Sequence, residues 1–338
     1  MKPKLIALQS SPQLRRHLRP YASLLAGVMC FPVAAYGERP PVQPRTLEEL
    51  LRMPPDELAR VDIGLMNLLC AEGLPGTGGL DVRGTVKTLD HWAERVRRET
   101  ARHLYRVHDP RYADQFCGSE SHFLCAFLVQ VLQEDFGVHY NAARMNDPDA
   151  RNSKDLFIHG MIGNDNGGTC ISMPVLYVAV GRRLGYPLSL VLAKRHVFCR
   201  WDGWGQRLNF DGSATGLLGF PDDEFYHQWP EPFTAAELES GAFLKPLTPT
   251  EELALFLNTR GVCLHKVGRL TEAINALRPA TTRMPENPNF QHNLRLTETL
   301  LEQQRIKAEY RLRQEVEQFL PRLPQPSIPD PRVHKKKP

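Results

Sequence analysis

The stretch "GNDNGGTCISMPVLYVAVGRRLGYPLSLVLAKRHVFCRW", residues 163–201, contains the change of pattern that decides the fold. It begins as a polar, glycine-rich loop that leads to Cys170. The apolar run of residues 172–184 follows, and Gly185 and Pro187 come directly after it, as is typical where a helix ends. The pattern therefore predicts a helix with Cys170 at its N-terminus.

The segments on either side of this helix predict an α+β fold. Residues 188–193, 196–201 and 206–211 are short and rich in Val, Leu, Phe and Trp, which indicates antiparallel strands, with a tight turn at Asp202-Gly203. Upstream, residues 46–137 repeat apolar positions at the helical spacing and predict a helical lobe. A helical lobe followed by a small antiparallel sheet is an α+β architecture.

The composition fits a globular protein with no strongly basic face. Of 338 residues, 42% are hydrophobic and 24% are charged, and the net charge is +4, with several lysines and arginines at the two ends. Binding of nucleic acid is therefore not expected. The seven cysteines have irregular spacing without a CxxC pair, so no metal motif is visible. Cys117 and Cys125 are the closest candidates for a disulfide in an oxidising compartment, although spacing alone does not give connectivity.

The first residues have the pattern of a targeting segment. In residues 1–37, a basic part ending at Arg19 precedes an uncharged part with small residues at Ala35 and Gly37. This pattern predicts a signal peptide and an exported, periplasmic or secreted protein. An uncleaved membrane anchor is the main alternative, although Pro32 interrupts the apolar run. Membrane contact is expected only through this segment, and a cytoplasmic protein with an unusual N-terminus also stays open. A proline-rich linker, residues 38–45, follows.

The C-terminal part is helical again over residues 250–317 and has a repeat signature. Its small and apolar residues fall in the register of a tetratricopeptide unit of about 34 residues, spanning residues 254–287. The next stretch loses the register and predicts a capping helix. One unit is too short to stand alone, so we expect it to dock on the preceding domain, as a brace or as a binding site for a protein partner. Residues 318–338 are proline-rich and basic, which predicts a disordered tail.

Three residues form a candidate catalytic set. A helix N-terminus favours the thiolate form of Cys170. His196 opens the second predicted strand and Asp211 ends the third. If those strands form a hairpin, Asp211 binds one imidazole nitrogen and leaves the other for the thiol, which is the logic of a nucleophile, base and orienting acid.

Less specific interpretations of the same residues remain. Cys170 is alternatively a small buried residue at a helix start. A zinc site of Cys170, His196 and Cys199 is disfavoured, because a strand points His196 and Cys199 to opposite faces. Other side chains are weaker candidates: His159, Asn164 and Asp165 in the loop, Trp201, Trp204 and Trp229 at a groove, Asn152 and Asn166 as oxyanion donors beside the Cys170 N–H, and Thr169 or Asn166 as helix caps.

The quoted segments "GGTCISMPVLYVAVGRRLGYPLSLV", "HVFCRW" and "LNFDGS" resemble the transglutaminase-like superfamily. With "DARNSKDLFI" and "DIGLMNLLCAEG", the chain is similar more narrowly to the bacterial SirB-type branch, which joins this core to C-terminal tetratricopeptide units. The resemblance implies a papain-like domain over residues 46–240, with Cys170 as nucleophile, His196 as base and Asp211 as acid. Many SirB-type chains lack this cysteine, so its presence here favours activity.

The resulting prediction is a thiol-dependent acyl-transfer enzyme that needs no cofactor and no metal. Its substrate would be a peptide or protein amide, either hydrolysed, as by a peptidase or amidase, or transferred to an amine, as by a transglutaminase. The alternative is a non-catalytic scaffold that binds a protein partner through the tetratricopeptide helices.

Overall fold

The computed structural model describes residues 40–145, 147–212 and 219–319. The predicted signal or anchor segment and almost all of the predicted tail lie outside these ranges. In chain order the α helices are α1 (Leu47–Arg52), α2 (Pro55–Leu58), α3 (Ile63–Ala71), α4 (Val82–His103), α5 (Ala113–Phe116), α6 (Glu120–Phe136), α7 (Ser172–Arg183), α8 (Asp223–Gln228), α9 (Ala235–Glu239), α10 (Pro249–Lys266), α11 (Leu270–Arg283) and α12 (Pro288–Phe319). Short 3-10 helices are η1 (Leu104–Val107), η2 (Ala142–Arg144), η3 (Ser153–Asp155) and η4 (Ile158–Gly160).

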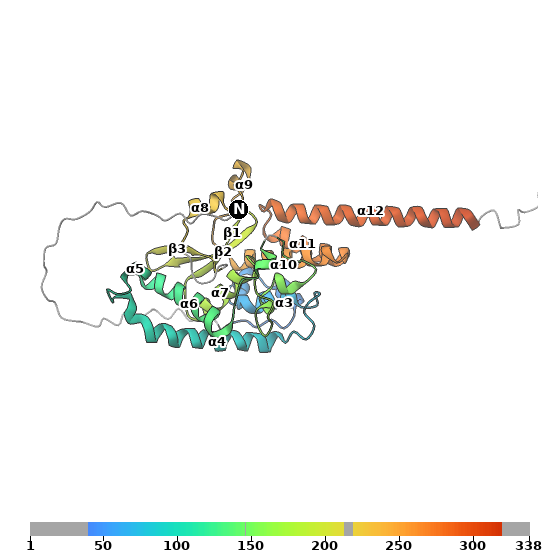
Figure 1. Cartoon of the computed structure of the whole chain (residues 1–338). Helices are drawn as coiled ribbons and strands as arrows, with labels where there is room; N and C mark the ends of the chain where they lie inside the picture. Colours follow the sequence, from blue (N-terminus) through green and yellow to red (C-terminus); the bar gives the residue numbers. More distant parts are fainter. Residues whose placement is uncertain (1–39, 146, 213–218, 320–338) are drawn as a thin grey trace, which may run out of the picture. The chain divides into compact units, whose positions relative to one another are not determined.

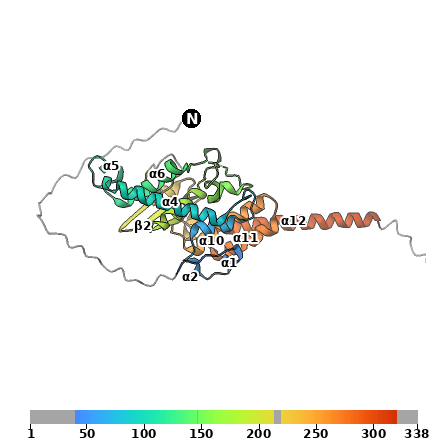
Figure 2. The same ribbon diagram turned by 90° about the horizontal axis from the view of Figure 1, so that it is seen from below.

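The helical character expected of residues 46–137 is confirmed, since α1 to α6 lie within this range. α3 is buried along its whole length, and it contacts both α4 and α7. α4 and α6 pack side by side (Figures 1 and 2). Because α4 buries Leu89, Trp92 and Val96 on one face and exposes most of its charged residues, it forms the outer layer of this lobe.

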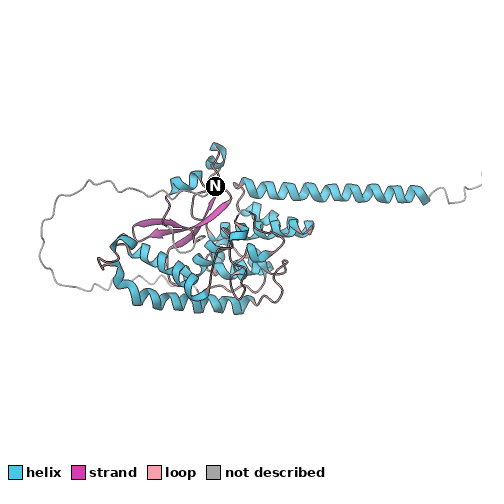
Figure 3. Ribbon diagram, in the orientation of Figure 1, coloured by secondary structure: helices cyan, strands magenta, loops and turns pink. Residues whose placement is uncertain are grey.

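The sheet has the order β1-β2-β3 and is antiparallel, so the predicted α+β class is confirmed (Figure 3). Its strands are β1 (Leu188–Ala193), β2 (His196–Gly203) and β3 (Gln206–Phe210). The predicted turn at Asp202-Gly203 is wrong, because both residues still pair with β3. The turn is Trp204-Gly205 instead, with φ of 54° and 73°. Two consecutive positive φ values define the tight hairpin turn that matches strand twist, and the glycine adopts one of them without strain.

α7 connects the helical lobe to the sheet, since it contacts α3, α4, β1 and β2. Its residues from Ser172 to Gly181 are all buried. A Cβ atom at Gly181 would lie 2.4 Å from Cδ1 of Leu188, so this glycine is what allows β1 to approach the helix closely. The helix that follows Cys170 is therefore fixed on several sides.

The C-terminal helices pack against this core. α10 and α11 lie side by side and α10 contacts α3. Arg182 of α7 makes two hydrogen bonds to the buried Glu252 of α10, at 3.0 and 2.6 Å. Gly261 lets Leu277 of α11 approach, as the repeat register expects, but membership of the tetratricopeptide class stays a prediction. Residues 302–318 of α12 are exposed (Figure 1). Within the described ranges, no helix has both the length and the hydropathy needed to cross a membrane.

Candidate active site

Cys170 lies in the first turn of helical hydrogen bonding, just before the assigned start of α7. The N–H of Met173 donates to the carbonyl of Thr169 at 3.0 Å, so helical bonding begins at Thr169. The Thr169 side chain accepts from Ile171 N at 3.3 Å, and Ser172 Oγ accepts from Thr169 N at 3.0 Å. These bonds fix the start of this turn, but the N-cap residue of α7 itself is Ile171, which makes no side-chain cap hydrogen bond. The two predicted caps, Thr169 and Asn166, are therefore wrong for α7.

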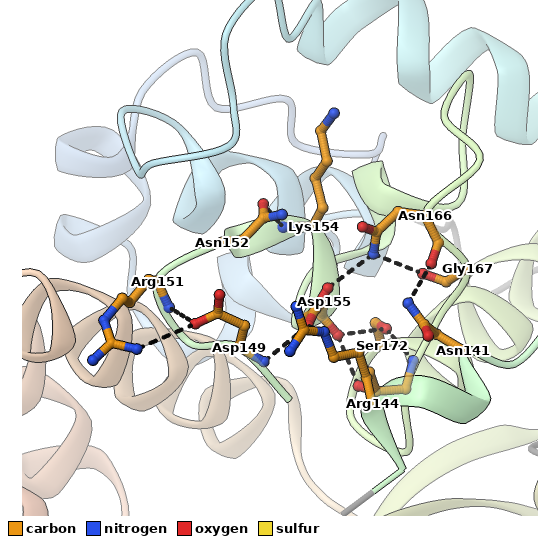
Figure 4. Close-up of polar contacts among 11 residues, drawn as sticks. Asn141, Arg144, Asp149, Arg151, Asn152, Lys154, Asp155, Asn166, Gly167 and Ser172 are labelled. Carbon is orange, nitrogen blue, oxygen red and sulfur yellow. Dashed lines mark hydrogen bonds and ion pairs between the residues drawn. The ribbon is translucent and has the colours of Figure 1, made fainter. Parts of the chain in front are cut away.

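A buried carboxylate, Asp155, holds the loop that carries the cysteine (Figure 4). Its carbonyl accepts the hydroxyls of Thr169 at 2.7 Å and Ser172 at 3.3 Å. Its carboxylate accepts from Asn166 Nδ2 at 2.9 Å and forms an ion pair with Arg144 at 3.3 Å. These contacts fix the loop before Cys170 to residues that precede and follow the cysteine in the chain.

His196 and Asp211 are in contact. Cys199 pairs with Phe210, so Asp211 follows opposite Phe198 and reaches His196 along the diagonal of the sheet rather than directly across it. His196 Nε2 lies 2.9 Å from Asp211 Oδ2. A carboxylate accepts, so Nε2 carries the hydrogen and Nδ1 is left for another partner. His196 as a residue is 4% exposed, and Trp229 meets its ring edge to face with the ring centroids 4.6 Å apart.

Cys170 and His196 line the same cleft, which has a volume of about 830 Å³. Aromatic and aliphatic side chains form much of its wall, and polar amides form another part. The lining residues are Tyr140, Met145, Pro148, Cys170, Ile171, Leu192, Ala193, Arg195, His196, Val197, Trp229, Pro230, Glu231, Phe243, Leu255, Asn258, Thr259, Asn287, Asn289 and Phe290.

The thiol of Cys170 is not in the state that its place at a helix N-terminus predicts. Burial raises its pKa to about 11, and the carboxylate of Asp211 adds to the rise. A backbone N–H and Arg195 act in the opposite direction but are weaker. At neutral pH the resting thiol is therefore protonated, because desolvation of the thiolate outweighs the helix end.

Tyr140 is a cleft residue that the sequence did not suggest. It forms a bridge with Gly168, in which Gly168 N donates to His139 O and Asn141 N donates to Gly168 O, both at 2.8 Å. Burial and the charges of Cys170 and Asp211 raise the pKa of the Tyr140 hydroxyl to about 12. The hydroxyl therefore remains a hydrogen-bond donor at the cleft. Its loop has no periodic pattern that would have marked it in advance.

Two rival interpretations of the cysteines have little support. Cys199 is fully buried and its Sγ donates to the carbonyl of Pro174 at 3.4 Å, on the face of β2 opposite to His196. In the described ranges, no group of three histidine, cysteine or acidic side chains is arranged to hold a metal ion. The six cysteines within those ranges are all free, including the candidate pair Cys117, which is exposed, and Cys125, which is buried.

Most of the weaker site candidates named from the sequence do not line the cleft. Neither Asn152 nor Asn166 lines the cleft, and the amide of Asn166 is committed to Asp155 and Gly167, so neither is the expected oxyanion donor. His159 is buried, with Nε2 3.2 Å from Ser153 Oγ.

Of the remaining candidates, one lines the cleft and the others do not. Asn164 donates to backbone carbonyls within its own loop. Of the three tryptophans, Trp201 is buried and Trp204 lies at the hairpin turn, whereas Trp229 lines the cleft. Asp165 is an exposed loop residue.

Residues 84–249 match the family model of the transglutaminase-like superfamily. The chain thus has a transglutaminase-like superfamily domain over these residues, which include Cys170, His196 and Asp211. No curated protein and no solved structure gives a match.

Proposed function

We propose that the chain is a thiol-dependent acyl-transfer enzyme that acts on peptide or protein amides, with Cys170 as nucleophile, His196 as proton carrier and Asp211 as the orienting carboxylate. One observation carries the proposal: Cys170 and His196 line one cleft, while the far nitrogen of the imidazole is bound to Asp211 at 2.9 Å. The superfamily match of residues 84–249 supports the reaction class.

The protonated thiol determines the first step. Because the pKa of Cys170 is raised to about 11, its proton must leave as the sulfur attacks the carbonyl carbon. His196 Nδ1 takes that proton, and the imidazolium that forms is held by Asp211 through Nε2–H. The negative charge on the carbonyl oxygen is then stabilised by the backbone N–H of Cys170 and by the hydroxyl of Tyr140.

The remaining steps return the site to its starting state. His196 gives the proton to the leaving nitrogen, the carbon–nitrogen bond breaks, and an amine or ammonia departs from a thioester on Cys170. Water or a second amine then attacks the thioester carbonyl while His196 accepts its proton. The proton passes to the sulfur as the carbon–sulfur bond breaks. Hydrolysis and transfer to an amine share every step except the identity of this second nucleophile.

We further propose the SirB-type branch for this chain. The motifs "DIGLMNLLCAEG" and "DARNSKDLFI" support it, and so do the helices α10 to α12 that follow the matched domain. A tetratricopeptide role for those helices is part of the same proposal, supported by the close packing of Gly261 on Leu277.

The test is turnover of a glutamine-containing dipeptide and of unfolded protein, with water or hydroxylamine as acceptor. Cys170→Ala and His196→Ala should each lower kcat/KM by about a thousandfold or more, because the nucleophile and base act as a unit. Tyr140→Phe should lower kcat by about a hundredfold with little change in KM, as expected for an oxyanion donor. Cys117→Ser, which removes an exposed thiol, should behave as wild type.

Mass spectrometry of the wild-type chain after incubation with an activated ester gives the decisive outcome. An acyl group on Cys170 that hydroxylamine removes, and that His196→Ala fails to acquire, supports the enzyme. A chain that turns over none of these substrates and never acquires an acyl group at Cys170 is instead the non-catalytic scaffold.

A further inference from the structure

The cleft has a second wall, built by helices that lie outside the matched domain. Leu255, Asn258 and Thr259 come from α10, and Asn289 and Phe290 come from the first turn of α12. All of them lie beyond residue 249, where the family match ends. The C-terminal helices therefore complete the space that Cys170 faces.

In this second wall the side-chain amide of Asn258 is held in position while its donor nitrogen stays available. Asn258 Oδ1 accepts from Asn293 Nδ2 at 3.0 Å, which fixes the orientation of the Asn258 side chain. The Nδ2 of Asn258 then donates to no residue in the described part of the chain. The side chain of Asn289 is exposed. By contrast, Asn287 uses its Oδ1 to accept the N–H groups of Asn289 and Phe290 at the start of α12.

The charged side chains that line the cleft neutralise one another, which disfavours a highly charged ligand. Arg195 and Glu231 are its lining residues with permanent charge, and they lie 3.8 Å apart as an ion pair. Glu231 is further neutralised by Lys194 at 3.1 Å. Apolar side chains such as Leu255, Phe243 and Phe290 form much of the rest. A phosphate, a nucleotide or a run of acidic residues would find no concentrated positive charge here.

We propose that this second wall binds the polypeptide that flanks the reacting amide, with Asn258 Nδ2 donating to a backbone carbonyl of a segment in extended conformation. An extended segment leaves its backbone groups unpaired, and it offers both a carbonyl for the amide donor and side chains for the apolar surface. The substrate class is then an unfolded or flexible polypeptide with uncharged residues near the reacting amide, not a free amino acid. That the bound segment flanks an amide attacked by Cys170 rests on the proposed function. Binding of the segment itself does not require the thiol.

Binding is measured on the full chain with Cys170→Ala, so that no reaction intervenes. The probe is fluorescein-labelled, reduced and carboxymethylated ribonuclease, and the readout is fluorescence anisotropy. Asn258→Ala should weaken the Kd about fivefold, which corresponds to one uncharged hydrogen bond. Asn289→Trp should weaken it about tenfold or more by filling the cleft. Asn275→Ala, an exposed asparagine on α11 outside the cleft, is the matched control and should leave the Kd unchanged.

The outcomes separate the two proposals. If the unfolded probe does not bind, or if Asn258→Ala and Asn289→Trp bind it as well as Asn275→Ala does, the second wall is not a polypeptide subsite. If the expected pattern of Kd values appears but wild-type Cys170 never forms a thioester, the subsite stands and the enzymatic proposal fails. If the expected pattern of Kd values appears and wild-type Cys170 also forms the thioester, both proposals stand.

Discussion

The alkylation rate of Cys170 should depend on pH in a way that distinguishes a protonated resting thiol from a preformed thiolate. With its pKa raised to about 11, about one thiol in a thousand is ionised at pH 8. An ordinary cysteine with a pKa of about 8.5 is about one quarter ionised at that pH. The thiolate of higher pKa is about tenfold more nucleophilic, which offsets part of the difference. Iodoacetamide should therefore modify Cys170 about twentyfold more slowly than a small-molecule thiol at pH 8.

The pH profile gives the sharper measurement. The sign follows from the raised pKa: the reactive thiolate is lost as pH falls below about 11, so the rate should rise about tenfold per pH unit from 6 to 10. Mass spectrometry of the peptide containing Cys170 measures the rate. The exposed Cys117 in the same chain is the internal control for the reactivity of the reagent at each pH. A rate already at its maximum near pH 6 would refute the reasoning, because it requires a thiolate paired with a charged His196 at rest.

Two further perturbations follow from the same contacts. Asp211→Asn should change alkylation and catalysis in opposite directions: removing its charge lowers the pKa of Cys170 and speeds alkylation at pH 8, while the lost orientation of His196 lowers kcat by about a hundredfold or more. A parallel fall of both rates would contradict this assignment. Asp155→Ala should lower the free energy of unfolding by about 1–3 kcal/mol, because Asn166 loses its buried acceptor while Arg144 is exposed enough to regain water. Denaturant unfolding measures this loss, and a change below about 1 kcal/mol would show that the loop holds without the carboxylate.

The parts of the fold that the sequence predicts are those with local signals. The helix after Cys170 has a glycine-rich start, an apolar body and a Gly185 end, and the structure has α7 there. The strands around His196 follow from their β-branched and aromatic residues, which do not depend on distant contacts. The hairpin turn was misplaced by two residues because Asp202-Gly203 is itself a favoured turn pair. Strand pairing continues to Gly203 and Gln206, so tertiary pairing decided against the local preference.

The parts of the candidate site that the sequence could not predict depend on contacts between distant segments. Tyr140 reaches the cleft through a bridge to Gly168, and nothing in its own neighbourhood indicates that pairing. Asn258 comes from a helix that the sequence assigns to a separate unit. The expectation that Cys170 is a thiolate was wrong for the same reason. The helix end that favours the thiolate is a local feature, whereas the burial that outweighs it depends on the surrounding fold.

In one respect Asp211 acts against the chemistry we propose, since its charge raises the pKa of the thiol that must react. The conflict is resolved by considering when each charge exists. In the resting site the thiol is neutral, so the carboxylate costs it nothing. During attack the sulfur forms a bond to carbon and its charge passes to the carbonyl oxygen, while the proton moves to His196. Asp211 then lies 2.9 Å from a cationic ring, and its attraction for that ring is greater than its repulsion of a charge that has moved away. The same carboxylate that keeps Cys170 protonated at rest therefore favours the transition state, which is why Asp211→Asn should separate alkylation from catalysis.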